Sequence, residues 1–162
     1  MRAGPLEEAD FPAAGFDAVV MWDVIEHLWD PMTAMRTVAR LLRPGGRLCL
    51  STPNAGSAMA RLLGRRWAFM TPPEHLGFFN QQSMARLLDS AGMELNQWTS
   101  LGKWVNAGFM LYKLGRIFPA LAVTKPRGTG RRGPLDKLVV YAPTGDVAYA
   151  GGRLARPMGN DS

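Results

Sequence analysis

The order of apolar and amphipathic segments between residues 16 and 52 constrains the fold more than any other feature of the chain. Residues 18–21 form a continuous apolar run, which is typical of a strand covered on both faces in a parallel sheet. Asp30 and Pro31 then provide an N-cap and a first-turn proline for a helix whose apolar residues recur at helical spacing. A second apolar strand begins at residues 48–50. The segment therefore predicts a strand–helix–strand unit, whose crossover is almost always right-handed.

The rest of the chain adds expected elements of both kinds. We predict helices at residues 57–63, 81–91 and 103–118, strands at 93–99 and 147–149, and a basic loop at 124–134. For the helix at 81–91 we expect Asn80 as the N-cap and an inward face that contains Met84 and Leu88. Little chain separates the final strands, which favours antiparallel pairing between them. Together with the first unit, these elements predict an α/β fold.

Gly45 and Gly46 invite comparison with a phosphate-binding loop, but their position argues against that function. They follow a predicted helix and precede a predicted strand. A phosphate cradle has the reverse order, with glycines between a strand end and a helix start. We therefore expect a simple turn here.

Length and composition are those of a single globular domain. The chain has 162 residues, of which 47% are hydrophobic, so it can bury a core. Its one cysteine, Cys49, excludes a disulfide framework and a cysteine-based zinc site. The N-terminal segment is acidic and lacks the apolar stretch of a signal peptide, which predicts a cytoplasmic protein. We expect one domain over residues 1–157 and a short tail at 158–162.

Charge is distributed unevenly along the chain. Residues 1–30 carry one basic and seven acidic residues, although the formal net charge of the whole chain is +6. Residues 101–137 hold eight basic residues and one acidic residue, interleaved with aromatic residues. A basic helix with aromatic residues can lie on an anionic membrane surface. We interpret this segment as a helix-plus-loop insertion or lid with peripheral membrane contact; the alternative is a solvated helix over the sheet. No nucleic-acid-binding module is recognisable, and nucleic acid is not a predicted partner.

Polar side chains gather after the carboxyl ends of both strands of the first unit, where ligands bind in open α/β sheets. The candidates are Trp22, Asp23, Glu26 and His27 after the first strand, Ser51, Thr52 and Asn54 after the second, and Glu74 and His75 in a proline-rich loop. Each histidine has an acidic neighbour. A neighbouring carboxylate raises the pKa of a histidine and selects its tautomer, which suits a proton acceptor near neutral pH.

Each candidate also has a purely structural interpretation. The acidic residues and the histidine after the first strand could serve only capping and solvation before the next helix. The Glu74–His75 pair could be structural, and Asn54 could be a turn residue. Trp22 could be a pocket wall or a core residue rather than a stacking platform. These alternatives remain open from the sequence.

Three stretches carry a family resemblance: FDAVVMWDVIEHLWDP, LLRPGGRLCLSTPN and RWAFMTPPEHLGFFNQQSMARLLDSAGMEL. They resemble class I S-adenosylmethionine-dependent methyltransferases, and most closely the group that includes the ubiquinone-biosynthesis O-methyltransferases. The resemblance extends from residue 4 to about residue 100. It implies a Rossmann-like, seven-stranded sheet with helices on both faces, in which residues 17–22 are the fourth strand and residues 47–52 are the fifth.

The resemblance also implies positions for the cofactor, S-adenosylmethionine. The segment after the fourth strand lines its methionine and sulfonium end in the family, which indicates Trp22 and Asp23. The loop after the third strand flanks its adenine, which indicates Pro5 and Leu6. The family often has an acidic residue next to the apolar one, and Pro5 departs from that pattern.

The implied chemistry is an in-line transfer of a methyl group to a small-molecule acceptor, with O-methylation favoured. The protein positions the reactants and accepts a proton from a hydroxyl acceptor, for which His27 and His75 are the candidate bases. We assign Asn54 and Glu74 to the substrate. In the quinone O-methyltransferases an acid-x-x-Glu-His group resembles a magnesium site, and Asp23, Glu26 and His27 match it, with aspartate at the first place.

The family's first strand, its glycine-rich turn and the ribose-binding acid after the second strand find no match in this sequence. Residues 17–22 would then form an exposed apolar edge that can pair with another chain. We expect a late annotated start or a truncated gene. The alternative is a true fragment, inactive alone or completed by a partner. A different class of function is a non-catalytic, methyltransferase-like module that binds a membrane surface or a partner.

Overall fold

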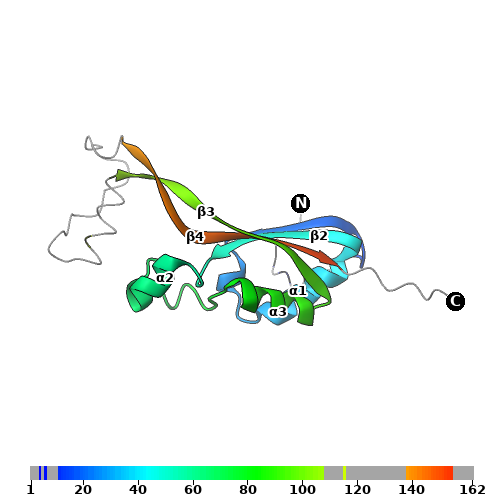
Figure 1. The fold of residues 1–162 in the computed structure, drawn as a ribbon. Coiled ribbons are helices and arrows are strands. Elements are labelled where there is room, and N and C mark those ends of the chain that lie inside the picture. The colour runs from blue at the N-terminus through cyan, green and yellow to red at the C-terminus, as the bar shows by residue number, and fades with distance from the viewer. Residues whose placement is uncertain (1–3, 5, 7–10, 108–114, 116–137, 155–162) are drawn as a thin grey trace.

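The computed structural model describes residues 4, 6, 11–107, 115 and 138–154 of the chain. This part of the sequence contains four strands and the helices that connect the first three of them (Figure 1). In chain order the elements are β1 (Phe16–Trp22), the 3₁₀ helix η2 (Ile25–His27), α1 (Pro31–Leu41), β2 (Leu42–Pro53), α2 (Ala58–Leu63), the 3₁₀ helix η3 (Gly64–Arg66), α3 (Gln81–Ser90), β3 (Met93–Asn106) and β4 (Val139–Leu154). The described chain is therefore of the predicted α/β class.

The strands form one mixed sheet in the order β1-β2-β4-β3. β1 and β2 are parallel, with Trp22 paired to Ser51, so their carboxyl ends lie side by side. β4 is antiparallel to both β2 and β3, which confirms the antiparallel arrangement predicted for the end of the chain. The parallel pair connected through α1 is the predicted strand–helix–strand unit.

Local signals in the sequence start the two long helices where expected. The Asp30 carboxylate accepts hydrogen bonds from the Thr33 N–H at 3.0 Å and the Thr33 hydroxyl at 2.6 Å, which cap α1 and lower the pKa of Asp30. At the start of α3, Asn80 and Ser83 form a reciprocal capping box. These bonds satisfy N–H groups that a helix end leaves without partners.

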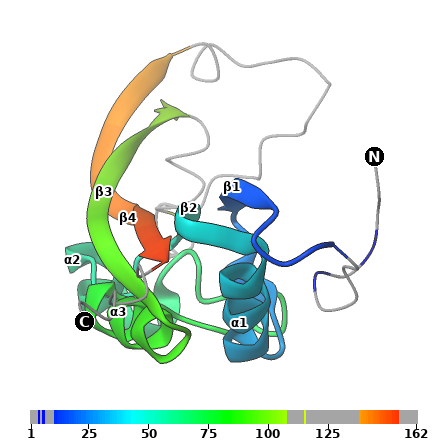
Figure 2. The same cartoon turned by 90° about the vertical axis from the view of Figure 1, so that its right-hand side faces the viewer.

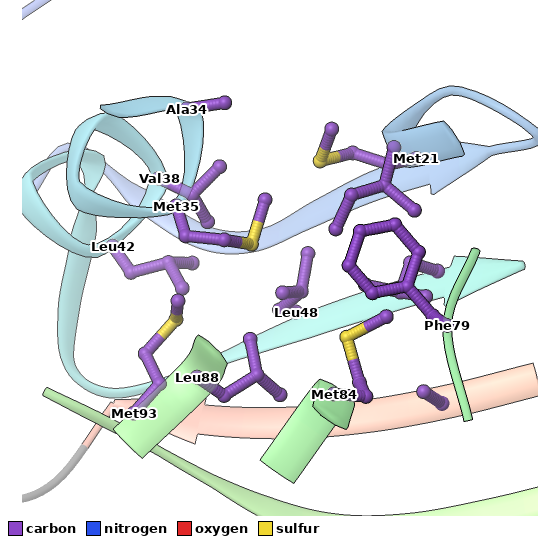
Figure 3. Close-up of a cluster of buried hydrophobic side chains, with 13 residues drawn as sticks. Met21, Ala34, Met35, Val38, Leu42, Leu48, Phe79, Met84, Leu88 and Met93 are labelled. Carbon is purple, nitrogen blue, oxygen red and sulfur yellow. The ribbon is translucent and has the colours of Figure 1, made fainter. Parts of the chain in front are cut away.

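The helices α1, α2 and α3 lie on one face of the sheet, as two perpendicular views show (Figures 1 and 2). The apolar sides of α1 and α3 form the core with the inner face of the sheet (Figure 3). The fully buried members include Met35 and Val38 of α1, Leu48 of β2, and Met84 and Leu88 of α3. This core holds α3 against the strands whose ends carry the candidate site.

On the opposite face of the sheet, the side chains of β1 are more exposed than we expected. We predicted a strand covered on both faces, but Val20 is 54% exposed and Trp22 is 55% exposed. The helices α1, α2 and α3 lie on the other face of the sheet and do not cover this one. β1 also pairs with β2 alone among the described strands and forms an edge of the sheet. Pairing of another chain with residues 17–22 stays a prediction.

The predicted helix at residues 103–118 is wrong at its start. Residues 103–106 belong to β3, where they pair with residues 139–142 of β4. This long antiparallel ladder satisfies the backbone groups of both strands, and that pairing overrides local helical spacing. Ala107 and Gly115 are helical. The remainder of the basic segment up to residue 137, including the loop at 124–134, lies outside the described residues.

The final strand is much longer than predicted, since β4 extends well beyond residues 147–149 in both directions. No helix in the described part of the chain is long and apolar enough to cross a membrane.

Candidate functional site

The first part of the site is the junction between the ends of β1 and β2. The Asp23 N–H donates to the Ser51 carbonyl at 3.2 Å and to the Ser51 hydroxyl oxygen at 3.0 Å. The Ser51 hydroxyl in turn donates to the Asp23 carboxylate at 2.8 Å. Asp23 adopts a left-handed backbone conformation with φ of 51°, which aspartate tolerates better than most residues. These contacts hold the Asp23 carboxylate at the rim of the sheet.

The second part is Glu26, which is only 1% exposed. The Thr52 hydroxyl donates to its carboxylate at 3.1 Å. Its backbone carbonyl accepts hydrogen bonds from the N–H groups of Leu76 and Gly77 at 2.8 and 3.0 Å. These two bonds attach the loop that contains His75 to the 3₁₀ helix that contains His27.

The two histidines consequently lie against each other. Their ring centroids are 4.9 Å apart in an edge-to-face arrangement. His27 Nδ1 lies 2.7 Å from the Glu74 carbonyl, and His75 Nδ1 lies 2.7 Å from the Phe69 carbonyl. A carbonyl can only accept, so in each neutral ring Nδ1 carries the hydrogen and Nε2 keeps a free lone pair. The sequence indicated both histidines separately, but not their contact.

Glu26, His27 and His75 also form a group of metal-ligand type, with ligand atoms within 4.8 Å of one another. The predicted magnesium set was Asp23, Glu26 and His27. The structure brings Glu26 and His27 together with His75, and Asp23 is not a member of the group. The carboxylate of Asp23 is bonded to Ser51 instead.

Aromatic side chains surround His75, which is half-buried. Phe69 stacks on its ring at a centroid distance of 6.2 Å, and Phe78 lies edge-on at 6.4 Å. Trp67 contacts both phenyl rings, at 5.4 and 6.4 Å. The sequence analysis did not assign these three residues to the site, although they lie in one aromatic-rich stretch on either side of His75.

The predicted cofactor residues have different surroundings. Trp22 is exposed, so its interpretation as a core residue is wrong, and its ring lies edge-to-face with Tyr149 at 6.1 Å. Leu6 is half-buried and packs against the core. Pro5 lies outside the described residues.

The predicted substrate residues Asn54 and Glu74 have different environments. Asn54 is 8% exposed; its amide donates to the Ser100 hydroxyl at 2.8 Å and its carbonyl oxygen accepts from the Gly56 N–H at 2.9 Å. These bonds support its interpretation as a turn residue. The side chain also lines an open pocket of about 330 Å³ at the start of α3. Glu74 is exposed, and its backbone carbonyl holds His27.

Asp146 is a supporting residue that sequence reasoning missed. Its carboxylate accepts from the Ser57 hydroxyl at 3.1 Å and from the Trp67 indole N–H at 3.3 Å, and its backbone carbonyl accepts from the Asn54 N–H at 2.7 Å. It thereby links β4 to the aromatic stretch beside His75. Its partners lie 79 to 92 positions away in sequence, so no local pattern could have indicated them.

Known proteins resemble this chain in sequence and in fold. A family model described as a methyltransferase domain matches residues 3–97. A probable S-adenosylmethionine-dependent methyltransferase of Mycolicibacterium smegmatis is 38% identical over 110 residues, which are 67% of this chain and 39% of that protein. A ubiquinone biosynthesis O-methyltransferase of Xanthomonas oryzae pv. oryzae is 35% identical over 97 residues, which are 51% of this chain and 41% of that protein. The match therefore spans less than half the length of either relative.

The fold resembles solved methyltransferase structures. A putative methyltransferase of Bacillus halodurans superposes with a TM-score of 0.58 at 16% identity, over 94% of this chain and 70% of that one. At this identity the likeness concerns the fold alone. It agrees with the Rossmann-like arrangement expected from the sequence.

Proposed function

The chain belongs to the methyltransferase-domain family, and we propose that it transfers the methyl group of S-adenosylmethionine to a hydroxyl oxygen of a small-molecule acceptor. The Xanthomonas relative, which is named as an O-methyltransferase, supports oxygen as the accepting atom. The observation that carries the proposal is the His27–His75 pair beside the ends of two parallel strands, with both Nε2 lone pairs free.

Trp22 and Asp23 fit a cationic cofactor. S-adenosylmethionine supplies a methyl group on a positively charged sulfur and also carries an ammonium group. The exposed indole of Trp22 attracts cations through its π face, and the Asp23 carboxylate is held at the same rim by Ser51. Leu6, which packs against the core, is the described candidate for contact with the adenine.

The histidine pair supplies the base. A free Nε2 within reach of the acceptor hydroxyl accepts its proton as the oxygen becomes bonded to the methyl group. Phe69 and Phe78 form apolar walls beside His75, which suits a flat, apolar acceptor that carries the hydroxyl. Holding the two reactants in line is the remaining task of the protein.

Calorimetric titration of the chain with S-adenosylhomocysteine tests the cofactor assignment, and Asp23→Asn should weaken that binding. A methyl-transfer assay on a panel of aromatic alcohols then tests the base. We expect at least one of His27→Ala and His75→Ala to lower kcat by about 10²–10⁴-fold, the usual contribution of a general base. Wild-type rates in both variants would remove the histidines from the mechanism. Absence of cofactor binding by the folded chain would contradict a complete site in these 162 residues.

A further inference from the structure

We propose that Glu26, His27 and His75 bind a divalent first-row transition-metal ion such as Zn²⁺. Their ligand atoms converge within 4.8 Å, although His75 lies 48 positions after His27 in the sequence. The inference uses the histidines of the proposed function but does not depend on methyl transfer.

The tautomers of both histidines suit metal binding. Each Nδ1–H is donated to a backbone carbonyl at 2.7 Å, from His27 to Glu74 and from His75 to Phe69. Histidines that bind metals almost always donate their second ring N–H to a carbonyl, a carboxylate or water, which fixes the ring and leaves the other nitrogen as ligand. Here both rings already have this second interaction, so Nε2 is the nitrogen that each ring retains for a metal.

Glu26 supplies the charge that a cation would balance. The side chain is almost completely buried, and among the described residues its carboxylate accepts a hydrogen bond from the neutral hydroxyl of Thr52. The salt bridge between the described residues Asp17 and Arg43 does not involve Glu26. A buried carboxylate without a cationic partner carries a desolvation cost that a bound divalent ion would offset.

The backbone holds the three ligands together, and small side-chain movements complete the site. The Glu26 carbonyl binds the N–H groups of Leu76 and Gly77, which anchors the His75 loop directly to the turn that carries the other two ligands. Ligand atoms of a tetrahedral zinc ion lie about 3.3 Å apart, given bonds of about 2.0–2.1 Å. Closing from 4.8 Å to that spacing requires each ring to move by less than one bond length, and the exposed side of His27 leaves room for it.

The ligand set selects the class of metal. Magnesium prefers an all-oxygen octahedral shell, whereas two imidazoles and one carboxylate suit zinc and its neighbours. Three protein ligands leave a coordination position open, as in catalytic zinc sites. In the metal-bound protein the Nε2 atoms are occupied, so proton removal from a hydroxyl would rest on acidification by the metal instead of on a histidine base.

The test titrates ZnCl₂ into the full chain, free of any affinity tag, by calorimetry in a non-chelating buffer. We expect one zinc ion per chain, and at least tenfold weaker binding in Glu26→Gln and His75→Ala. Glu74→Gln, which removes a negative charge from the same loop, should leave the affinity within twofold. Asp23→Asn should do the same, because its carboxylate is bonded to Ser51. MgCl₂ should not compete with zinc.

A second measurement needs no variant. The chain contains two histidines, so long-range ¹H–¹⁵N spectra of the imidazole rings report on both without ambiguity. We expect Nδ1-protonated rings before zinc is added, and a zinc-induced shift of Nε2 in both.

Three results would overturn the inference. They are zinc affinity unchanged in Glu26→Gln and His75→Ala, a zinc-induced shift in only one histidine, and loss of binding in Asp23→Asn with retention in His75→Ala. The last result would favour the magnesium set predicted from the sequence. Because zinc alone is the probe, failure here leaves the methyl-transfer proposal standing, and absence of methyl transfer leaves the metal site standing.

Discussion

At the scale of single residues, Ser51 connects the fold to the candidate site. Its hydroxyl is buried, donates to the Asp23 carboxylate and accepts from the Asp23 N–H. The left-handed backbone of Asp23 therefore depends on a side chain from the neighbouring strand. The sequence indicated that both residues follow strand ends, but the adjacency of those ends is what allows the bond.

Ser51→Ala should lower the free energy of unfolding by about 1 kcal/mol, because it removes a partly buried hydrogen-bonded pair. Urea unfolding measures the change. Ser90→Ala, at the exposed end of α3, is the matched control and should stay within about 0.5 kcal/mol of wild type. Equal losses in both variants would show that the Asp23–Ser51 contact does not stabilise the rim.

At the scale of elements, α3 packs on the strands whose ends carry the candidate site. Leu88 is fully buried and contacts the sheet at Gly152, where an added Cβ would lie 3.2 Å from the leucine methyl carbon. The helical spacing of apolar residues predicted the inward face of α3, and its start at the Asn80 cap, because both depend on residues within a few positions. The full length of β3 and β4 could not be predicted in this way, since their ladder joins distant segments.

Leu88→Ala should lower the free energy of unfolding by about 2–5 kcal/mol, the usual cost of removing a fully buried leucine side chain. Denaturant unfolding followed by circular dichroism measures it. Leu62→Ala on α2 is the control, because Leu62 is 80% exposed and should change stability little. A loss below 1 kcal/mol at Leu88 would contradict tight packing of α3 on the sheet.

At the scale of the whole molecule, the described part of the sheet has an exposed edge at β1 and exposed apolar side chains on one face of that strand. Val20 and Trp22 are more than half exposed, and within the described strands β1 pairs on one side only. An edge strand with apolar side chains is a template for pairing with another chain. The family resemblance led us to expect residues 17–22 at an edge of the sheet, and β1 lies there in the described sheet. The apolar run led us to expect burial of β1 on both faces, and the exposure of Val20 and Trp22 corrects that expectation.

Val20→Lys should reduce self-association of the purified chain, because a charged side chain on an edge strand opposes pairing. Sedimentation velocity over a range of concentrations measures the change. Leu62→Lys introduces the same charge on α2, away from the edge, and should leave association unaltered. A wild-type chain that stays monomeric at all concentrations, or an equal effect of both lysines, would contradict pairing through β1.

By itself, the sequence determined the strand–helix–strand unit, the caps of α1 and α3 and the family, because each depends on local spacing or on contiguous motifs. Only the tertiary structure decided that His75 meets His27 and Glu26, and that Asp146 holds Trp67. Those contacts join residues dozens of positions apart. The histidine contact forms because the Glu26 carbonyl binds the loop that follows His75, and Asp146 is brought to this region because β4 pairs with β2.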